Sequence, residues 1–144
     1  MTTGDTVRPA LRRVLTQDAG TRTDAHAVAA AALRAYERLA QELAPVIGEA
    51  GLHAVCARSV HLTQREFSWL AAADSAGPRD APFAHVRLSL EGQDPAVATD
   101  AAIAVLATFG ELLASFIGDS LTTRLFRKAW PDGFSDNTTQ ETQT

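Results

Sequence analysis

Two short stretches, "LAPVIGEA" (Leu43–Ala50) and "LASFIGDS" (Leu113–Ser120), decide how the rest of this sequence is interpreted. They lie 70 positions apart, and each runs Leu-Ala, two variable residues, Ile-Gly, an acid and a small residue. Glycine adopts backbone conformations that other residues avoid, so it commonly ends a helix. An acid in the first turn of a helix offsets the positive end of the helix dipole. Each stretch therefore predicts a joint between two helices.

A long helical pattern precedes each joint. From Asp24 to the first joint, apolar side chains recur at steps of three and four residues, as on one buried helix face. From Asp94 to the second joint the chain is apolar on most sides, and Pro95 occupies the first helical position. Asp24 and Asp94 are both predicted N-caps, and they also differ by 70 positions. The matching starts, lengths and ends indicate duplication of a helical hairpin.

These patterns predict an all-α fold, a four-helix bundle built from two αα-hairpins with an internal duplication at an offset of 70 residues. We expect a single helical domain over residues 24–131, with hairpins at 24–73 and 94–131 and a connector at 74–93. Within the connector, residues 82–91 alternate like a strand but have no second strand to pair with. A short helix or an irregular connector is favoured there, and a strand stays open.

The two ends of the chain are polar. Residues 1–23 predict disorder or a short N-terminal helix, and residues 132–144 predict a disordered tail. The start does not resemble a signal peptide, so we expect a cytoplasmic protein. Residues 96–117 are long enough to span a bilayer, but their apolar content is mostly alanine and Glu111 lies in their second half. A buried central helix is favoured over a membrane span.

Composition excludes several classes of function. The net charge of −4 argues against non-specific nucleic-acid binding, which requires a concentrated basic face. The single cysteine, Cys56, excludes an intramolecular disulfide and a multi-cysteine metal site, and it falls on a buried helical stripe. The sequence has no phosphate-binding glycine loop, no GxSxG and no HExxH motif. We therefore expect no catalytic residues, no metal and no cofactor.

The residues beside the two glycines are the candidate ligand-binding residues. Glu49 and Asp119 each follow a glycine, and in an up-down-up-down bundle both lie at one end. His53 is four positions after Glu49, on the same helical face. Glu49, His53 and Asp119 are the predicted site. The alternative is that the two acids only offset helix dipoles.

The two tryptophans are candidate interface anchors. Trp69 lies in "REFSWL" with Arg65, and Trp130 lies in "RKAWPD" with Arg127. Tryptophan and arginine are enriched at the centres of protein interfaces. The alternative is that each indole covers the core, with its N–H bonded to water or to a backbone carbonyl.

The sequence as a whole predicts a non-enzymatic helical interaction or regulatory module. It would act through contacts with a protein partner or with a second copy of itself, with no role for nucleic acid or membrane. Polar chemistry is sparse, and the helices are more apolar than burial within four helices requires. The alternative is a small-molecule sensor or carrier with an apolar pocket between the hairpins, gated near Glu49, His53 and Asp119. An enzyme ranks third.

Overall fold

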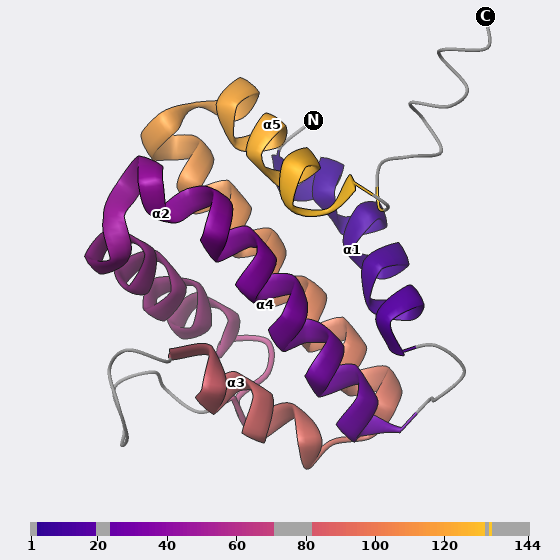
Figure 1. The fold of residues 1–144 in the computed structure, drawn as a ribbon. Helices are drawn as coiled ribbons and strands as arrows, with labels where there is room; N and C mark the ends of the chain where they lie inside the picture. The colour runs from indigo at the N-terminus through magenta and orange to yellow at the C-terminus, as the bar shows by residue number, and fades with distance from the viewer. Residues whose placement is uncertain (1–2, 20–23, 71–81, 132, 134–144) are drawn as a thin grey trace, which may run out of the picture.

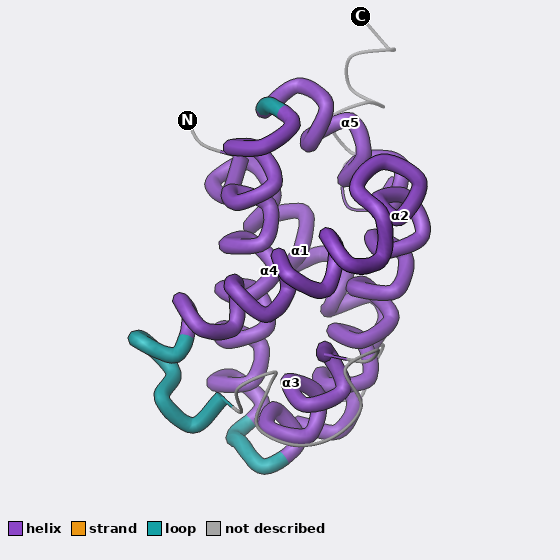
Figure 2. The backbone as a smooth tube through the Cα atoms, turned by 90° about the vertical axis from the view of Figure 1, so that its left-hand side faces the viewer, coloured by secondary structure: helices purple, strands orange, loops and turns teal. Residues whose placement is uncertain are grey.

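The computed structural model describes residues 3–19, 24–70, 82–131 and 133. Over these residues it contains helices and no strand, which confirms the all-α prediction. Figure 1 shows the arrangement, and Figure 2 shows the same helices from the side. The helices are α1 (Thr3–Ala19), α2 (Ala25–Thr63), α3 (Pro82–Glu91), α4 (Pro95–Ile117) and α5 (Asp119–Ala129). Residues 82–91 therefore form a helix and not a strand.

Both predicted joints are present, and they share one backbone conformation. Gly48 divides α2 into two rods, with φ 79° and ψ 162°. Gly118 separates α4 from α5, with φ 92° and ψ 155°. This region of positive φ and extended ψ is open essentially only to glycine, because a Cβ atom would clash with the backbone. One glycine therefore reverses the chain at each joint without a loop.

The predicted helix starts are correct, but only one of them has a side-chain cap. Asp24 Oδ1 accepts a hydrogen bond of 2.7 Å from the backbone N–H of Ala27. Asp94 directly precedes α4, yet its carboxylate accepts no hydrogen bond from the first turn. Pro95 explains this start, because its ring fixes a helical φ and it has no amide hydrogen that needs a partner.

The first hairpin was predicted to extend over residues 24–73. Its second helix, which is the second rod of α2, ends earlier than this. The α-helix ends at Thr63, and turns follow up to Leu70. The Gln64 side chain donates a hydrogen bond of 2.7 Å to the Leu70 carbonyl, which closes the chain on itself. Leu70 is buried within this turn. Residues 71–73 lie outside the described residues.

The N-terminal segment forms a helix that belongs to the core. Sequence left disorder or a short helix open for residues 1–23, and α1 occupies Thr3–Ala19. Its inner face packs on α4 and α2. The side chains that this face buries are Val7, Ala10, Leu11, Val14 and Leu15. The described residues form five helices, and α2 consists of two rods, so α1 and α3 are both additional to the four helices of the predicted bundle.

The first rod of α2 and α4 lie side by side and run in the same direction (Figure 1). Both glycine joints therefore lie at the same end of the molecule, as the sequence predicted. From this end the second rod of α2 and α5 return on opposite sides (Figure 1). α1 packs on α4, and α3 packs on α2.

α4 is a central helix, because it contacts each of the other four, as α2 also does. Residues 101–107 are buried on every side. Among the described residues α4 alone is long and apolar enough to cross a membrane, but 56% of its most apolar window is buried inside the protein. Burial by neighbouring helices accounts for its composition.

Aromatic contacts connect three of these helices. The Tyr36 ring of α2 stacks on Phe83 of α3, with centroids 4.7 Å apart. It also meets Phe109 of α4 edge to face at 5.9 Å. Such pairs contribute about 0.5–1.5 kcal/mol beyond the burial of their surface.

We expect Gly48→Ala and Gly118→Ala each to lower the free energy of unfolding by about 1–3 kcal/mol, because alanine is strained at these angles. Urea unfolding followed by circular dichroism measures the loss. The control is Gly51→Ala, where the new methyl makes an ordinary contact of 3.4 Å with Ile47 inside a helix. It should be neutral or stabilising. An equal loss in all three variants would contradict the joint geometry.

Candidate functional site

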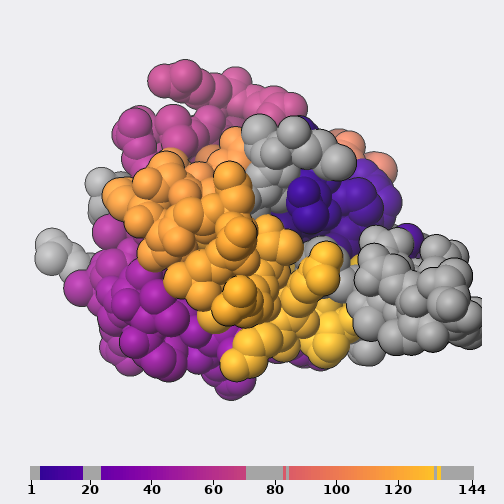
Figure 3. Space-filling model, turned by 90° about the horizontal axis from the view of Figure 1, so that it is seen from above, coloured from indigo at the N-terminus to yellow at the C-terminus, as the bar shows by residue number. Residues whose placement is uncertain are grey.

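Exposed apolar side chains mark the end of the molecule that holds the two joints. We call this surface, formed by residues 45–50 and 115–120, the joint end. Val46 is 45% exposed and Phe116 is 72% exposed, although both are large and apolar. Each precedes its joint glycine by two residues, so the two positions are equivalent. In Figure 3 the end of α4 and the middle of α2 adjoin on the visible face.

The adjacent isoleucines define how far the core extends towards this surface. Ile47 and Ile117 are partly buried and pack against the core. Val46 and Phe116, one residue earlier, project into solvent. The core therefore ends at these two isoleucines, and the side chains of Val46 and Phe116 lie outside it.

The predicted ligand residues share this end, but the hollow beside Asp119 does not bring the three together. Glu49 and Asp119 are both exposed, and His53 is half-buried. The hollow that contains Asp119 is lined by residues of α5, without Glu49 or His53. Among the described residues, no group of three His, Cys, Asp or Glu side chains is placed to hold a metal ion.

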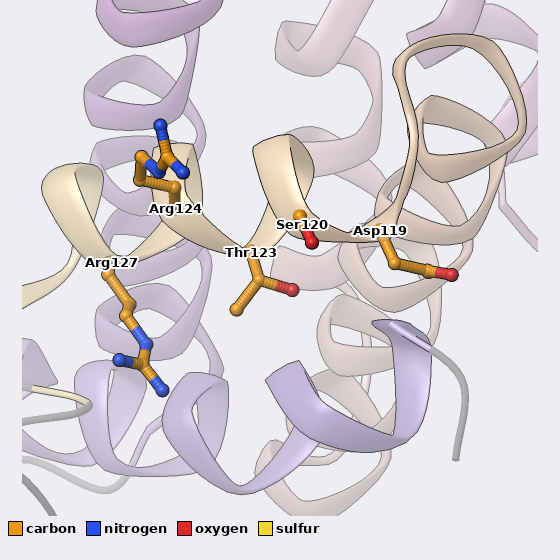
Figure 4. Close-up of a pocket in the computed structure, with 5 residues that line it drawn as sticks. All are labelled: Asp119, Ser120, Thr123, Arg124 and Arg127. Atoms are coloured by element: carbon orange, nitrogen blue, oxygen red, sulfur yellow. The ribbon is translucent and has the colours of Figure 1, made fainter.

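That hollow on α5 encloses about 440 Å³ and is lined by Asp119, Ser120, Thr123, Arg124 and Arg127. Figure 4 shows that the guanidinium groups of Arg124 and Arg127 point away from one another, and that the Asp119 carboxylate points away from both. Tight recognition of an anion requires donors that converge on it. This hollow is therefore a polar surface without the geometry of an anion site.

Trp130 was predicted as an interface anchor, and the structure corrects this. Its side chain is 0% exposed, and its Nε1–H donates a hydrogen bond of 2.9 Å to the Ala35 carbonyl of α2. Its ring meets Phe126 edge to face at 5.0 Å. The alternative reading, an indole that covers the core, is the correct one.

The other three predicted interface residues lie at the surface but not as one cluster with Trp130. Arg65 is exposed in the turn after α2. Trp69 is half-buried and meets Phe67 edge to face at 5.8 Å. Arg127 is exposed on α5, in the hollow described above.

The sequence patterns did not single out Val46 and Phe116 as exposed residues, although both lie in the repeated stretches. Both fall inside the two quoted stretches, at the variable positions before Ile-Gly. The helical pattern assigns them no special role, because an apolar residue near a helix end is most often buried. Only the direction of each rod beyond the glycine shows that they face solvent.

The buried interior holds one thiol and one phenol. Cys56 is fully buried, and burial raises its pKa to about 12. The Tyr36 hydroxyl lies beside Cys56, and burial together with this neighbour raises the pKa of Tyr36 well above the usual range. The thiol therefore keeps its proton at neutral pH and is a poor nucleophile.

Comparison of the chain with protein-family models, with curated proteins and with solved structures finds no match.

Alkaline pH should lower the free energy of unfolding, because Cys56 is buried. The folded state holds the thiol proton more tightly than the unfolded chain, whose cysteine pKa is about 8.5. The free energy of unfolding is therefore unaffected by this group below pH ~8.5 and falls as pH rises towards 12. Between pH 7 and 9.5 we expect Cys56→Ala to lose roughly 1 kcal/mol less than the wild type in urea titrations. Identical losses would contradict this prediction.

Trp130→Phe should lower the free energy of unfolding by about 1–3 kcal/mol, because it removes a buried hydrogen bond and leaves space in the core. Trp69→Phe is the matched control, since this indole is only half-buried. We expect a change below about 1 kcal/mol for the control. Urea unfolding measures both variants, and a larger loss for Trp69→Phe would refute the assignment.

Proposed function

We propose that this protein is a non-enzymatic helical interaction module that contacts another protein through its joint end. The observation that carries the proposal is the paired exposure of Val46 and Phe116, at 45% and 72%. Single exposed apolar residues are normal on protein surfaces. These two differ because they occupy equivalent positions at two equivalent joints, at one end of the molecule (Figure 1).

Energetics support a role in binding. Full burial of a side chain of this size contributes about 1.5–3 kcal/mol. The joint glycines and the acids after them are accounted for by helix termination and helix dipoles. Val46 and Phe116 are not accounted for in this way, because the core is closed without them. A partner that covers them provides the burial that the chain itself does not.

An internal duplication of the fold is also part of the proposal. We take the chain as two copies of one unit, residues 3–63 and 82–133, extending the hairpin duplication expected from sequence. Between 41–63 and 111–133, each described pair of positions 70 apart has the same degree of burial, except Ala57 and Arg127. The reciprocal packing of α1 on α4 and α3 on α2 also fits this reading. In this interpretation, the four helices of the bundle are the two rods of α2 together with α4 and α5.

The alternative of a small-molecule carrier has less support. It places a pocket between the hairpins with Glu49, His53 and Asp119 at its entrance. Glu49 and Asp119 are exposed at the surface, and the hollow beside Asp119 is polar and lies on α5. The interaction module is therefore the preferred function.

Site-specific photo-cross-linking tests the proposal. A photoreactive phenylalanine analogue is placed at position 116 or 46 of the full chain, in cells that naturally make the protein. We expect a discrete covalent adduct from both positions, whose mass distinguishes a second copy from a different protein.

The control position for this experiment is 88. Leu88 is also large, apolar and exposed, at 62%, but it lies on α3 and not at the joint end. No adduct from 116 and 46, or the same adduct from position 88, would overturn the proposal.

A further inference from the structure

We infer that α1 is an exchangeable helix, which leaves its place on the core while the rest of the fold stays intact. We call the surface of α4 and α2 that α1 covers the α1 site. When the site opens, the α1 helix of a second copy of this chain occupies it. The inference goes beyond the proposed interaction function and does not depend on it.

The α1 site accepts one apolar face of a helix. The side chains that α1 buries recur at steps of three and four residues and form one stripe: Val7, Ala10, Leu11, Val14 and Leu15. α1 runs antiparallel to α4, because Gly4 lies beside the Glu111 carboxylate and Arg12 lies beside Asp100. The α1 site therefore fits a helix with this spacing, and every copy of the chain contains that helix.

The sequence of α1 gives little support to its helical form. Pro9 lies inside the helix, and its side chain is exposed, so it adds nothing to the core. Proline has no amide hydrogen to donate to the carbonyl four residues earlier, that of Asp5, and its ring crowds that carbonyl. Most helical stability in proteins comes from tertiary packing. α1 is therefore helical chiefly because its apolar face is packed in the α1 site.

Two polar contacts of α1 lie where water can replace them. Arg12 Nη2 is 3.6 Å from Asp100 Oδ1, and these side chains are 61% and 62% exposed. Ion pairs as exposed as this one contribute little stability. Arg13 Nη1 donates its hydrogen bond of 3.2 Å to the Gly133 carbonyl, also in a partly exposed position. The opening of α1 therefore costs mainly the burial of its apolar face.

α3 is held differently, although it is the shorter helix. Pro82 is the first residue of α3, a position at which proline favours a helix. Arg87 and Glu91 form an ion pair one turn apart, with Nε and Oε2 at 3.2 Å. Phe83 is buried and stacks on Tyr36. Local sequence and packing agree in α3, whereas in α1 they conflict.

A second copy is the occupant that these contacts favour. An opened chain exposes two complementary apolar surfaces, the stripe of α1 and the α1 site. Two copies that exchange their α1 helices cover both surfaces again, with the contacts of the closed form and no new interface. Two exchanged copies also hold two joint ends in one assembly, which strengthens binding to a partner with two binding segments.

Hydrogen exchange of the full chain measures the opening. We expect the amides of α1 to exchange about tenfold or more faster than those of α4, because α1 opens alone. Pro9→Ala restores an amide donor inside the helix and should slow exchange in α1 by about tenfold or more. The control is Pro45→Ala, which replaces the exposed proline inside α2 and should leave exchange in α1 unchanged.

A labelled peptide of residues 3–19 represents the α1 helix of a second copy. Fluorescence anisotropy at equilibrium measures its Kd for the full chain. Pro9→Ala should act in opposite directions in the two molecules. In the peptide it should lower the Kd by about tenfold, and in the full chain it should raise the Kd by a similar factor, because the chain's own α1 then competes better. Leu11→Asp in the peptide places a charge on the apolar stripe and should abolish binding.

Cross-linking tests whether two whole chains exchange α1. Arg12→Cys and Asp100→Cys variants are purified separately, mixed and treated with a short bismaleimide, with which the buried Cys56 does not react. We expect a covalent dimer, because these two positions meet across the α1 site. The control mixture pairs Arg12→Cys with Leu88→Cys on α3, which α1 does not contact in the described part of the chain. It should give no dimer.

The opposite results overturn the inference. They are exchange in α1 as slow as in α4, peptide binding that Pro9→Ala in the full chain does not weaken, and equal binding of the Leu11→Asp peptide. Absence of a covalent dimer from the first mixture, or an equal amount from the control mixture, also overturns it. None of these results bears on adducts from positions 46 and 116, so the proposed interaction function is tested separately.

Discussion

The backbone conformation at two glycines is the constraint on which the rest of this fold depends. Gly48 and Gly118 combine positive φ with extended ψ, a region closed to residues with a Cβ atom. Each reverses the direction of a long helix within one residue. The following rod is therefore placed against the helix before it. Because both joints have the same geometry, the second rod of α2 and α5 are placed in equivalent ways.

Contacts between distant parts of the chain then complete the structure. The Trp130 indole bonds to the Ala35 carbonyl and fixes the end of α5 on α2. Beyond it, Arg13 Nη1 donates to the Gly133 carbonyl at 3.2 Å and ties the end of the described chain to α1. A Cβ atom at Gly133 would lie 2.9 Å from the Ala10 carbonyl oxygen, so glycine allows this close approach. Both ends of the described chain are thereby held on the central helices.

Because each joint consists of a single glycine, one end of the molecule is chemically distinct. A loop would have covered the helix ends, but a joint of a single glycine leaves the residues on either side of it exposed. Val46 and Phe116 are apolar, and Glu49 and Asp119 are acidic. The buried thiol and phenol hold their protons. The physical basis of the proposed binding is therefore a consequence of how the chain turns.

The sequence by itself determined the two long helices, their starts and the two joints, because these depend on local rules of periodicity, capping and glycine geometry. Asp24, Pro95, Gly48 and Gly118 acted as those rules require. Burial of Cys56 also followed from helical spacing alone.

Only the tertiary structure decided the burial of Trp130, the exposure of Phe116 and the place of α1. Trp130 and Ala35 are 95 positions apart, so no local pattern records their contact. Phe116 is exposed because the rod after Gly118 leaves in a direction that local propensity does not specify. The sequence of an amphipathic segment such as α1 shows which face is apolar, but only the packing of the whole chain determines what covers this face.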